Sequence, residues 1–339
     1  MPLVLSQVLD RRTAREARRL ALFDAFPHLR AVDFYLTRED IRDLSHLADE
    51  LRSSSPLISL AGRLLSACVF VPPYAPRAEN GAYLPRSYTE VDRALDAAEC
   101  LRDVLRVDEM GLTFHHVTEW PIEAGAWTDD ELLAHLEEDR RLGYAYVAEV
   151  TARCLPRGFV PALENVAPVR NDHAVPGVQI TPRYETGFCG PTDLRLICER
   201  IRGLHVALDV CHLALGYEAR RAGQQPRINA LELGPDALHE ADPPYDFANA
   251  LETLGPYLAF VHLSGCAGGR KELHEGGIPG EPGDKVDLMG LMERLAVAAD
   301  SRTLALAIEI RDGHTEAGFP GVETAFRRVS AALDAVEGR

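Results

Sequence analysis

The sequence predicts a (β/α)₈ barrel, because short apolar runs typical of strands alternate eight times with longer amphipathic runs typical of helices. Alternation of this kind favours a parallel sheet covered by helices. Eight such units within 339 residues favour a sheet that closes into a barrel. Five of the apolar runs also end on a carboxylate or an imidazole. In a parallel barrel these ends face one mouth, where functional side chains collect.

The eight predicted strands share a high content of Val, Leu, Ile, Ala and Phe. They cover residues 3–6, 31–36, 66–71, 111–116, 159–164, 204–209, 258–263 and 303–310. Pro161 lies within the fifth run and lacks a backbone N–H, which argues against an ideal central strand. We nevertheless keep the fifth strand in the prediction.

A helical run follows each predicted strand. These runs cover residues 13–25, 39–53, 87–106, 129–153, 192–202, 245–254, 286–299 and 320–337. Three threonines stand directly before charged first turns and are therefore predicted N-caps: Thr37, Thr128 and Thr192.

The connections after the fifth, sixth and seventh strands are long and rich in Gly, Pro and charge. They cover residues 165–191, 213–244 and 264–285. Connections of this length are usually lids or binding loops, and all three would emerge beside the polar strand ends. Because no linker or repeat divides the chain, we predict a single domain over residues 1–339.

Charge and cysteine content limit the partners and the compartment. The net charge is 36 − 52 = −16 with neutral histidines, and such a surface repels a phosphate backbone, so no nucleic-acid partner is expected. No apolar run approaches the ~20 residues that cross a bilayer, and the first twenty residues lack the features of a signal peptide. The seven cysteines are an odd number without CxxC pairing, which favours reduced thiols in a cytoplasmic protein. We expect a small-molecule substrate and leave a homo-oligomer open.

Four polar residues at predicted strand ends suit a shared metal ion: Glu164, Asp209, His262 and Glu309. Oxygen and nitrogen donors of these types bind hard or borderline divalent cations. Glu309 lies inside an apolar run, LALAIEI, where an unpaired carboxylate would be costly to bury. A metal ion or a cationic substrate would offset that cost.

His212 follows Asp209 by three residues in the motif LDVCH and could reach the same centre once the strand bends away. It is therefore a candidate for both metal and substrate binding. Cys211 and Cys266 also lie near proposed ligands, and a thiolate ligand is conceivable. Buried, inert thiols are the interpretation that we favour for both.

Two adjacent histidines, His115 and His116, end the fourth predicted strand, and only one of them can face the mouth. Either one can bind metal or substrate. We favour His116 as the inward residue, from the phase of Leu112 and Phe114 on the same strand.

The connection after the seventh strand carries further charged candidates. Glu272 and His274 could add a second or third metal ion. Arg270 and Lys271 could hold an anionic or hydroxylated substrate.

The order of these residues resembles the xylose isomerase-like barrel superfamily, which includes sugar epimerases, sugar-phosphate isomerases, inosose dehydratases and endonuclease IV-type apurinic endonucleases. The resemblance covers most of the chain as topology, while specific identities are confined to the strand ends. By resemblance to the ketose epimerases, the metal ligands would be Glu164, Asp209, His262 and Glu309. The two glutamates would also exchange a proton at the substrate carbon, and His212 would contact the substrate.

Another branch, endonuclease IV, adds histidines after strands three and four and an Asp-x-His motif after strand seven. His115 or His116 matches strand four, and Glu272-Leu273-His274 resembles the loop motif with Glu in place of Asp. The segment Val71-Pro72-Pro73-Tyr74 offers no histidine after strand three, which departs from a three-metal site.

Two segments, Glu164-Asn165 and His262-Leu263-Ser264-Gly265, resemble motifs of a third branch, the multinuclear iron oxidases of peptide natural-product pathways. The segment Val210-Cys211-His212 departs from the asparagine-rich motif of that branch. The epimerase branch is not matched completely either, because Gly268 stands where those enzymes carry an arginine, and Arg270 could substitute.

The resemblance implies a divalent-metal-dependent isomerase or epimerase that acts on a polyhydroxylated small molecule of the sugar or cyclitol type. One to three ions of manganese, magnesium, zinc or iron are expected, and a cation of this kind polarises a carbonyl and its neighbouring hydroxyl. One glutamate, Glu164 or Glu309, would remove a proton from carbon and the other would return it. The alternatives are a multinuclear iron oxidase of natural-product biosynthesis and an endonuclease IV-like phosphoester hydrolase.

Overall fold

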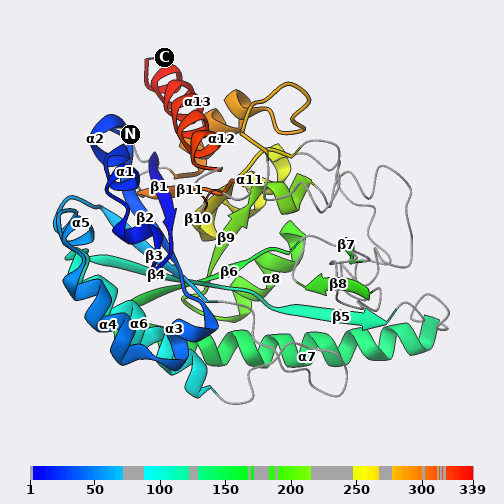
Figure 1. Cartoon of the computed structure of the whole chain (residues 1–339). Helices are drawn as coiled ribbons and strands as arrows, with labels where there is room; N and C mark the ends of the chain where they lie inside the picture. The colour runs from blue at the N-terminus through cyan, green and yellow to red at the C-terminus, as the bar shows by residue number, and fades with distance from the viewer. Residues whose placement is uncertain are drawn as a thin grey trace, which may run out of the picture.

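Eight parallel strands form a closed barrel with helices on its outside (Figure 1). The structure is a computed structural model and describes residues 3–71, 88–121, 129–166, 169–171, 183–187, 190–214, 247–266, 277–299, 302–310, 313, 315 and 318–338. The order around the barrel follows the chain: β1 (Leu3–Leu9), β2 (Leu29–Tyr35), β3 (Ser66–Phe70), β4 (Glu109–Phe114), β6 (Phe159–Glu164), β9 (His205–Asp209), β10 (Leu258–Leu263) and β11 (Leu304–Ile308), which closes on β1. The predicted (β/α)₈ barrel is confirmed.

All eight predicted strands are present, within a few residues of their expected bounds. β1 continues to Leu9, because its pairing with β2 extends to the Leu9–Phe34 pair. Pro161 does lie within β6, opposite Leu112 of β4. On its other side β6 pairs with β9 only from Ala162 onward, so Pro161 precedes that ladder and the missing donor is tolerated.

The helices lie between the strands, as predicted. They are η1 (Thr13–Arg15), α1 (Ala17–Leu20), α2 (Leu22–Ala25), α3 (Arg38–Arg42), α4 (Leu44–Ser53), α5 (Ser55–Ile58), α6 (Thr89–Leu105), α7 (Asp129–Cys154), η3 (Leu155–Arg157), α8 (Pro191–Arg200), α11 (Phe247–Leu254), η5 (Gly255–Tyr257), α12 (Leu288–Ala299) and α13 (Phe319–Glu337). None of the described helices is both long enough and apolar enough to span a bilayer.

The N-cap predicted at Thr37 is confirmed. Its hydroxyl accepts the Asp40 backbone N–H at 3.2 Å, and an Asp40 carboxylate oxygen accepts the Thr37 N–H at 2.8 Å, which is a complete capping box. The predicted run 39–53 is nevertheless divided. Asp43 ends α3 and caps α4 by accepting the His46 backbone N–H.

The N-cap predicted at Thr192 was wrong. α8 begins one residue earlier, at Pro191, with Gly190 at the N-cap. Proline suits this first helical position because its fixed φ is already helical and its missing N–H would have no partner there. Thr128 lies outside the described residues.

Small side chains surround one large ring inside the barrel. The inward layer consists of Val4, Ala31, Cys68, Ala162, Ala207, Phe260 and Ala305. Gly111 belongs to the same layer, since a Cβ there would overlap the ring of Phe260. Phe260 therefore fills the floor beneath the mouth. His262, two residues later on β10, points the same way one layer higher.

A three-stranded antiparallel sheet, which the sequence analysis did not predict, lies beside the barrel, to its right in Figure 1. It consists of β5 (Val117–Pro121), β8 (Arg183–Gly187) and β7 (Val169–Asn171). β5 follows β4 after two residues, and β7 and β8 come from the connection after β6. Part of the segment predicted as a lid or binding loop therefore forms strands.

Candidate metal centre

Four polar side chains come from neighbouring strands at the carboxyl-terminal end of the barrel. Glu164 and Asp209 are the last residues of β6 and β9, His262 is the last but one of β10, and Glu309 directly follows β11. His262 is in register with Asp209 on one side and with Ala307, two residues before Glu309, on the other. Glu164, Asp209 and His262 are buried, and 14% of the Glu309 side chain is exposed. The four predicted ligands are thus brought together.

Distances within this group are those of a coordination sphere. Nδ1 of His262 lies 3.1 Å from Oε1 of Glu164 and 3.5 Å from Oε1 of Glu309. Asp209, His262 and Glu309 each offer a donor atom within 4.8 Å of the other two. Two donor atoms that bind one cation at ~2.1 Å and at a right angle lie about 3 Å apart.

Several of the converging atoms have no hydrogen-bond partner among the described residues. They are Oε2 of Glu164, Nδ1 of His262, Oε1 of Glu309 and Nε2 of His115, all buried. His115 Nε2 and Glu164 Oε2 are only 2.9 Å apart, yet they are not aligned as a hydrogen bond. Buried polar atoms normally have a partner. Oxygen and nitrogen donors that converge without one therefore fit a divalent metal ion.

Burial and neighbouring charges shift the protonation of this group. For Glu309, burial and the adjacent carboxylates raise the pKa to about 8. For Glu164, burial would raise the pKa, but the charges of His115 and His262 outweigh it and hold the pKa well below its usual range. For His262, burial disfavours the charged form, but Glu164 and Glu309 raise its pKa well above the ordinary value. The group thus strongly favours an added positive charge.

His212 reaches the centre from the helical turn that follows β9. Oδ1 of Asp209 accepts the His212 backbone N–H at 2.7 Å, so Asp209 caps this turn as well. Nδ1 of His212 lies 2.8 Å from the carbonyl oxygen of Asn165. A carbonyl only accepts, so Nδ1 carries the proton and Nε2 is the nitrogen that would bind a ligand. Glu164, Asp209 and His212 form a second group of potential metal donors.

Asn165 is a supporting residue that sequence reasoning noted only as part of a motif. It is fully buried, and its side chain bonds the Asp209 backbone twice: Oδ1 accepts the N–H at 2.7 Å, and Nδ2 donates to the carbonyl at 3.0 Å. This pairing fixes the end of β9 against the end of β6. The two carboxylates, Glu164 and Asp209, are thereby held side by side.

Of the two adjacent histidines, His115 is the one that faces the centre, and the preference for His116 was wrong in this respect. The odd-numbered residues of β4 point into the barrel, as shown by Thr113, whose Oγ1 lies 3.0 Å from Sγ of Cys68. Phe114, an even-numbered residue, points outward, and its ring lies 5.9 Å from that of Tyr146 in α7. His116 continues that outer row and lies against Tyr146, with ring centroids 6.0 Å apart.

Asp33, in β2, is a residue of the centre that sequence reasoning missed. Its Oδ2 lies 3.1 Å from Nε2 of His262, and both side chains are buried. A signal was available, because Asp33 interrupts the apolar run AVDFYL just as Glu309 interrupts LALAIEI. The same desolvation argument applies to both carboxylates.

The remaining candidates fall into two groups. Cys211 and Cys266 are buried, and the hydrogen bond between them together with burial raises the pKa of the Cys211 thiol, which supports the interpretation as inert thiols. The loop candidates lie outside the described residues: Arg270, Lys271, Glu272 and His274.

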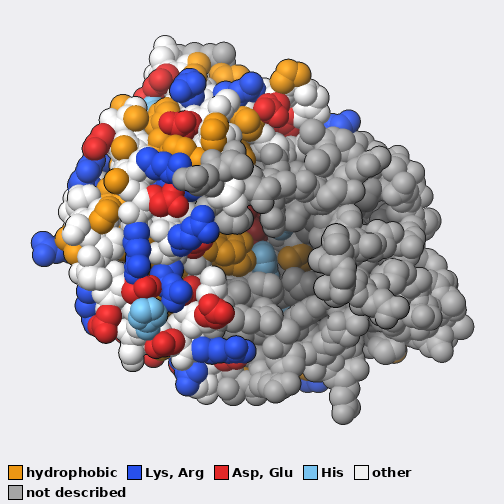
Figure 2. Space-filling view, in the orientation of Figure 1, with side chains coloured by type: hydrophobic (Ala, Val, Ile, Leu, Met, Phe, Trp, Pro, Cys, Tyr) orange, Lys and Arg blue, Asp and Glu red, His pale blue; other side chains and the backbone are white. Residues whose placement is uncertain are grey.

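A pocket of about 310 Å³ opens beside Glu309, between the ends of β1, β2 and β11. Hydroxyl, carboxyl and aromatic groups line it, including Asp10, Thr13 and Tyr35, and the Tyr35 ring stacks on Phe70 with centroids 4.1 Å apart. Figure 2 shows a histidine side chain in a hollow beside the grey residues, while side chains of both charges alternate over the rest of that face. The pocket offers polar contacts next to a proposed ligand.

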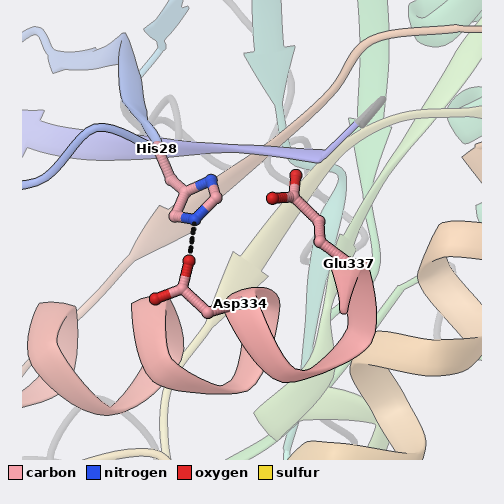
Figure 3. A group of neighbouring side chains, drawn as sticks. All are labelled: His28, Asp334 and Glu337. Atoms are coloured by element: carbon pink, nitrogen blue, oxygen red, sulfur yellow. Dashed lines mark hydrogen bonds and ion pairs between the residues drawn. The ribbon is translucent and has the colours of Figure 1, made fainter. Parts of the chain in front are cut away.

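A further group of potential ligands, His28, Asp334 and Glu337, lies at the surface near the start of β2 and the end of α13 (Figure 3). Nε2 of His28 pairs with Oδ1 of Asp334 at 2.8 Å, and the Asp334 side chain is 70% exposed. A solvent-exposed ion pair accounts for this arrangement. We therefore assign no metal to it.

Comparison with known proteins supports the fold. No family model and no curated protein sequence matches the chain. Among solved structures, a 3-keto-D-glucoside 4-epimerase from E. coli matches over 100% of both chains, with 13% identity and a TM-score of 0.52. A D-tagatose 3-epimerase-like protein matches over 98% of both chains, with 15% identity and a TM-score of 0.53.

An L-ribulose 3-epimerase matches over 98% of this chain and 95% of its own, with 13% identity and a TM-score of 0.51. At these identities the likeness is one of fold. The chain therefore shares the (β/α)₈ barrel fold of these epimerase structures, which is the fold that the resemblance of its strand ends implied.

Proposed function

We propose that this chain is a divalent-metal-dependent isomerase or epimerase that acts on a polyhydroxylated small molecule, such as a sugar or a cyclitol. The observation that carries the proposal is the convergence, at the mouth of the barrel, of buried donor atoms from Glu164, His262 and Glu309 that have no hydrogen-bond partner among the described residues. Further support comes from the pocket beside Glu309, whose lining includes the hydroxyl-bearing residues Thr13, Tyr35 and Thr37, and from the epimerase names of three structures with the same fold.

In this proposal the cation is held by Glu164, Asp209, His262 and Glu309. Such a cation, when bound, polarises a carbonyl and an adjacent hydroxyl. Oε1 of Glu164 and Oε1 of Glu309 lie 3.1 and 3.5 Å from Nδ1 of His262, so both carboxylates adjoin the same ligand atom. In the proposal, one glutamate removes a proton from carbon and the other returns it.

The other candidates have supporting roles in the proposal. His212 would contact the substrate through Nε2, since its Nδ1 is held by the Asn165 carbonyl. Arg270 and Lys271 would hold hydroxyl groups of the substrate, and His274 would be an additional ligand. His115 would replace His116 at the substrate, because it is the histidine that lies against Glu164.

Solvent hydrogen exchange tests the proposal directly. The chain loaded with Mn²⁺ should exchange a carbon-bound hydrogen of a free ketose such as D-tagatose in D₂O, as followed by NMR. Glu164→Gln and Glu309→Gln should each abolish the exchange, whereas Glu39→Gln, at an exposed position of α3, should not. Exchange at the native rate in either active-site variant would refute the assignment.

A second candidate function rests on the second donor group. Glu164, Asp209 and His212 lie close enough to hold another ion, and His115 adjoins Glu164. A centre with two or more ions would favour a multinuclear iron oxidase or an endonuclease IV-like phosphoester hydrolase. Elemental analysis of protein purified without chelator separates the three functions. One equivalent of metal favours the epimerase, several of iron with O₂ consumption favour the oxidase, and several of zinc favour the hydrolase.

A further inference from the structure

The contact between Asp33 and His262 crosses the interior of the barrel. β2 and β10 are not neighbours, because β1 and β11 lie between them in the order of the wall. Oδ2 of Asp33 nevertheless lies 3.1 Å from Nε2 of His262, and the side chains are 2% and 1% exposed. Burying a carboxylate is costly, so the contact of Asp33 with one imidazole across the barrel interior needs a chemical explanation.

The reason follows from what each atom can do. A carboxylate accepts hydrogen bonds, so the proton of the imidazole that faces it must be on Nε2. In the neutral ring, the lone pair of Nδ1 is then on the side that faces Glu164 and Glu309, at 3.1 and 3.5 Å. A metal-bound histidine commonly donates its other N–H to a carboxylate in this way, which fixes both its tautomer and its orientation.

We propose that Asp33 is a positioning residue that holds the His262 ring so that Nδ1 faces the cation. The inference rests on the proposed function, because it takes His262 to be a metal ligand. Phe70 also adjoins the ring, with centroids 6.4 Å apart and planes tilted by 55°, and offers no hydrogen bond. Without Asp33 the ring can turn and present a different edge to the metal.

Mn²⁺ affinity, measured by calorimetry on the full chain, tests the inference without using catalytic activity. Loss of an outer partner of this kind typically weakens metal binding 10- to 100-fold, and we expect this loss for Asp33→Ala. Asp33→Asn keeps an oxygen that can accept the Nε2–H bond, so it should retain part of the affinity. Asp40→Asn is the matched control, because Asp40 is equally buried but belongs to the capping box of α3.

Each outcome decides the matter. Binding by Asp33→Ala within about twofold of the wild type would overturn the inference while leaving the metal site intact. An equal loss in Asp40→Asn would overturn it too, since the effect would then be general loosening. A wild-type protein that binds no Mn²⁺, Zn²⁺ or Fe²⁺ would remove the proposed function and the inference with it. A second readout is the Nε2-bound proton of His262 in the Zn²⁺-loaded protein, which should be slow to exchange in the wild type and lost in Asp33→Ala.

Discussion

Replacing Glu309 with glutamine should stabilise the metal-free protein, and increasingly so as the pH rises. Burial and the adjacent carboxylates raise the pKa of Glu309 from an ordinary 4.5 to about 8. Between these values the unfolded chain has lost the proton and the folded chain retains it. The stability of the wild type therefore falls as the pH rises through this window. Glutamine has nearly the same shape, carries no charge and avoids the penalty.

The two pKa values set the magnitude. Each pH unit between them removes up to about 1.4 kcal/mol of the free energy of unfolding. On this basis the wild type is destabilised by roughly 1 kcal/mol at pH 5 and by about 3 kcal/mol at pH 7. Glu309→Gln should raise the free energy of unfolding by the same amounts at these pH values. This increase should approach its maximum near pH 8.

Urea unfolding in the presence of a chelator, at pH 5, 6 and 7, measures this difference. With saturating Mn²⁺ the order should reverse, because the wild type then gains binding energy through the carboxylate that the variant lacks. Glu39→Gln, at an exposed position, should follow the wild type at every pH. A Glu309→Gln protein that is no more stable than the wild type at pH 7, or a difference that is flat from pH 5 to 7, would contradict the reasoning.

Three further predictions concern the metal, the barrel floor and a helix start. Mn²⁺ affinity should rise from pH 6 to pH 8 by up to about tenfold per pH unit for each proton displaced, because the raised pKa values of Glu309 and His262 mean that binding must release protons. A calorimetric affinity independent of pH would contradict this. Gly111→Ala should lower the free energy of unfolding by about 1–3 kcal/mol through overlap with the Phe260 ring, and adding Phe260→Leu should restore part of the loss in urea unfolding. Thr37→Ala should lower the free energy of unfolding by about 1 kcal/mol, because it removes the capping box. A melting temperature equal to that of the wild type would show that the cap does not stabilise the protein.

The strand ends were predictable because the information is local. An apolar run that stops on a carboxylate or imidazole marks both a strand and the place where it opens to the mouth, and this identified Glu164, Asp209, His262 and Glu309. Choosing between adjacent histidines was harder, since it needed the inward phase of β4. Gly111, which makes room for the ring of Phe260, fixes that phase, but only the assembled barrel shows why a glycine stands there.

The supporting contacts could not be predicted in the same way, because they join distant parts of the chain. Asp33 and His262 are 229 positions apart, and Asn165 meets the Asp209 backbone across 44. No sequence period links such residues. The antiparallel sheet was missed for a related reason: β5 pairs with β8, which lies beyond α7 and β6 in the sequence, so β5 has no partner nearby.

The four proposed ligands come from consecutive strands of the barrel, β6, β9, β10 and β11, so these ligands lie in one half of it, and Asp33 of β2 reaches them from the other half. The pocket beside Glu309 is built mainly from β1 and β2 and the turns that follow them, in the other half. Under the proposed function, exchanging those turns would change the compound that is bound while the four ligands stay in place. Grafting the segments after β1 and β2 would be a practical route to altered specificity.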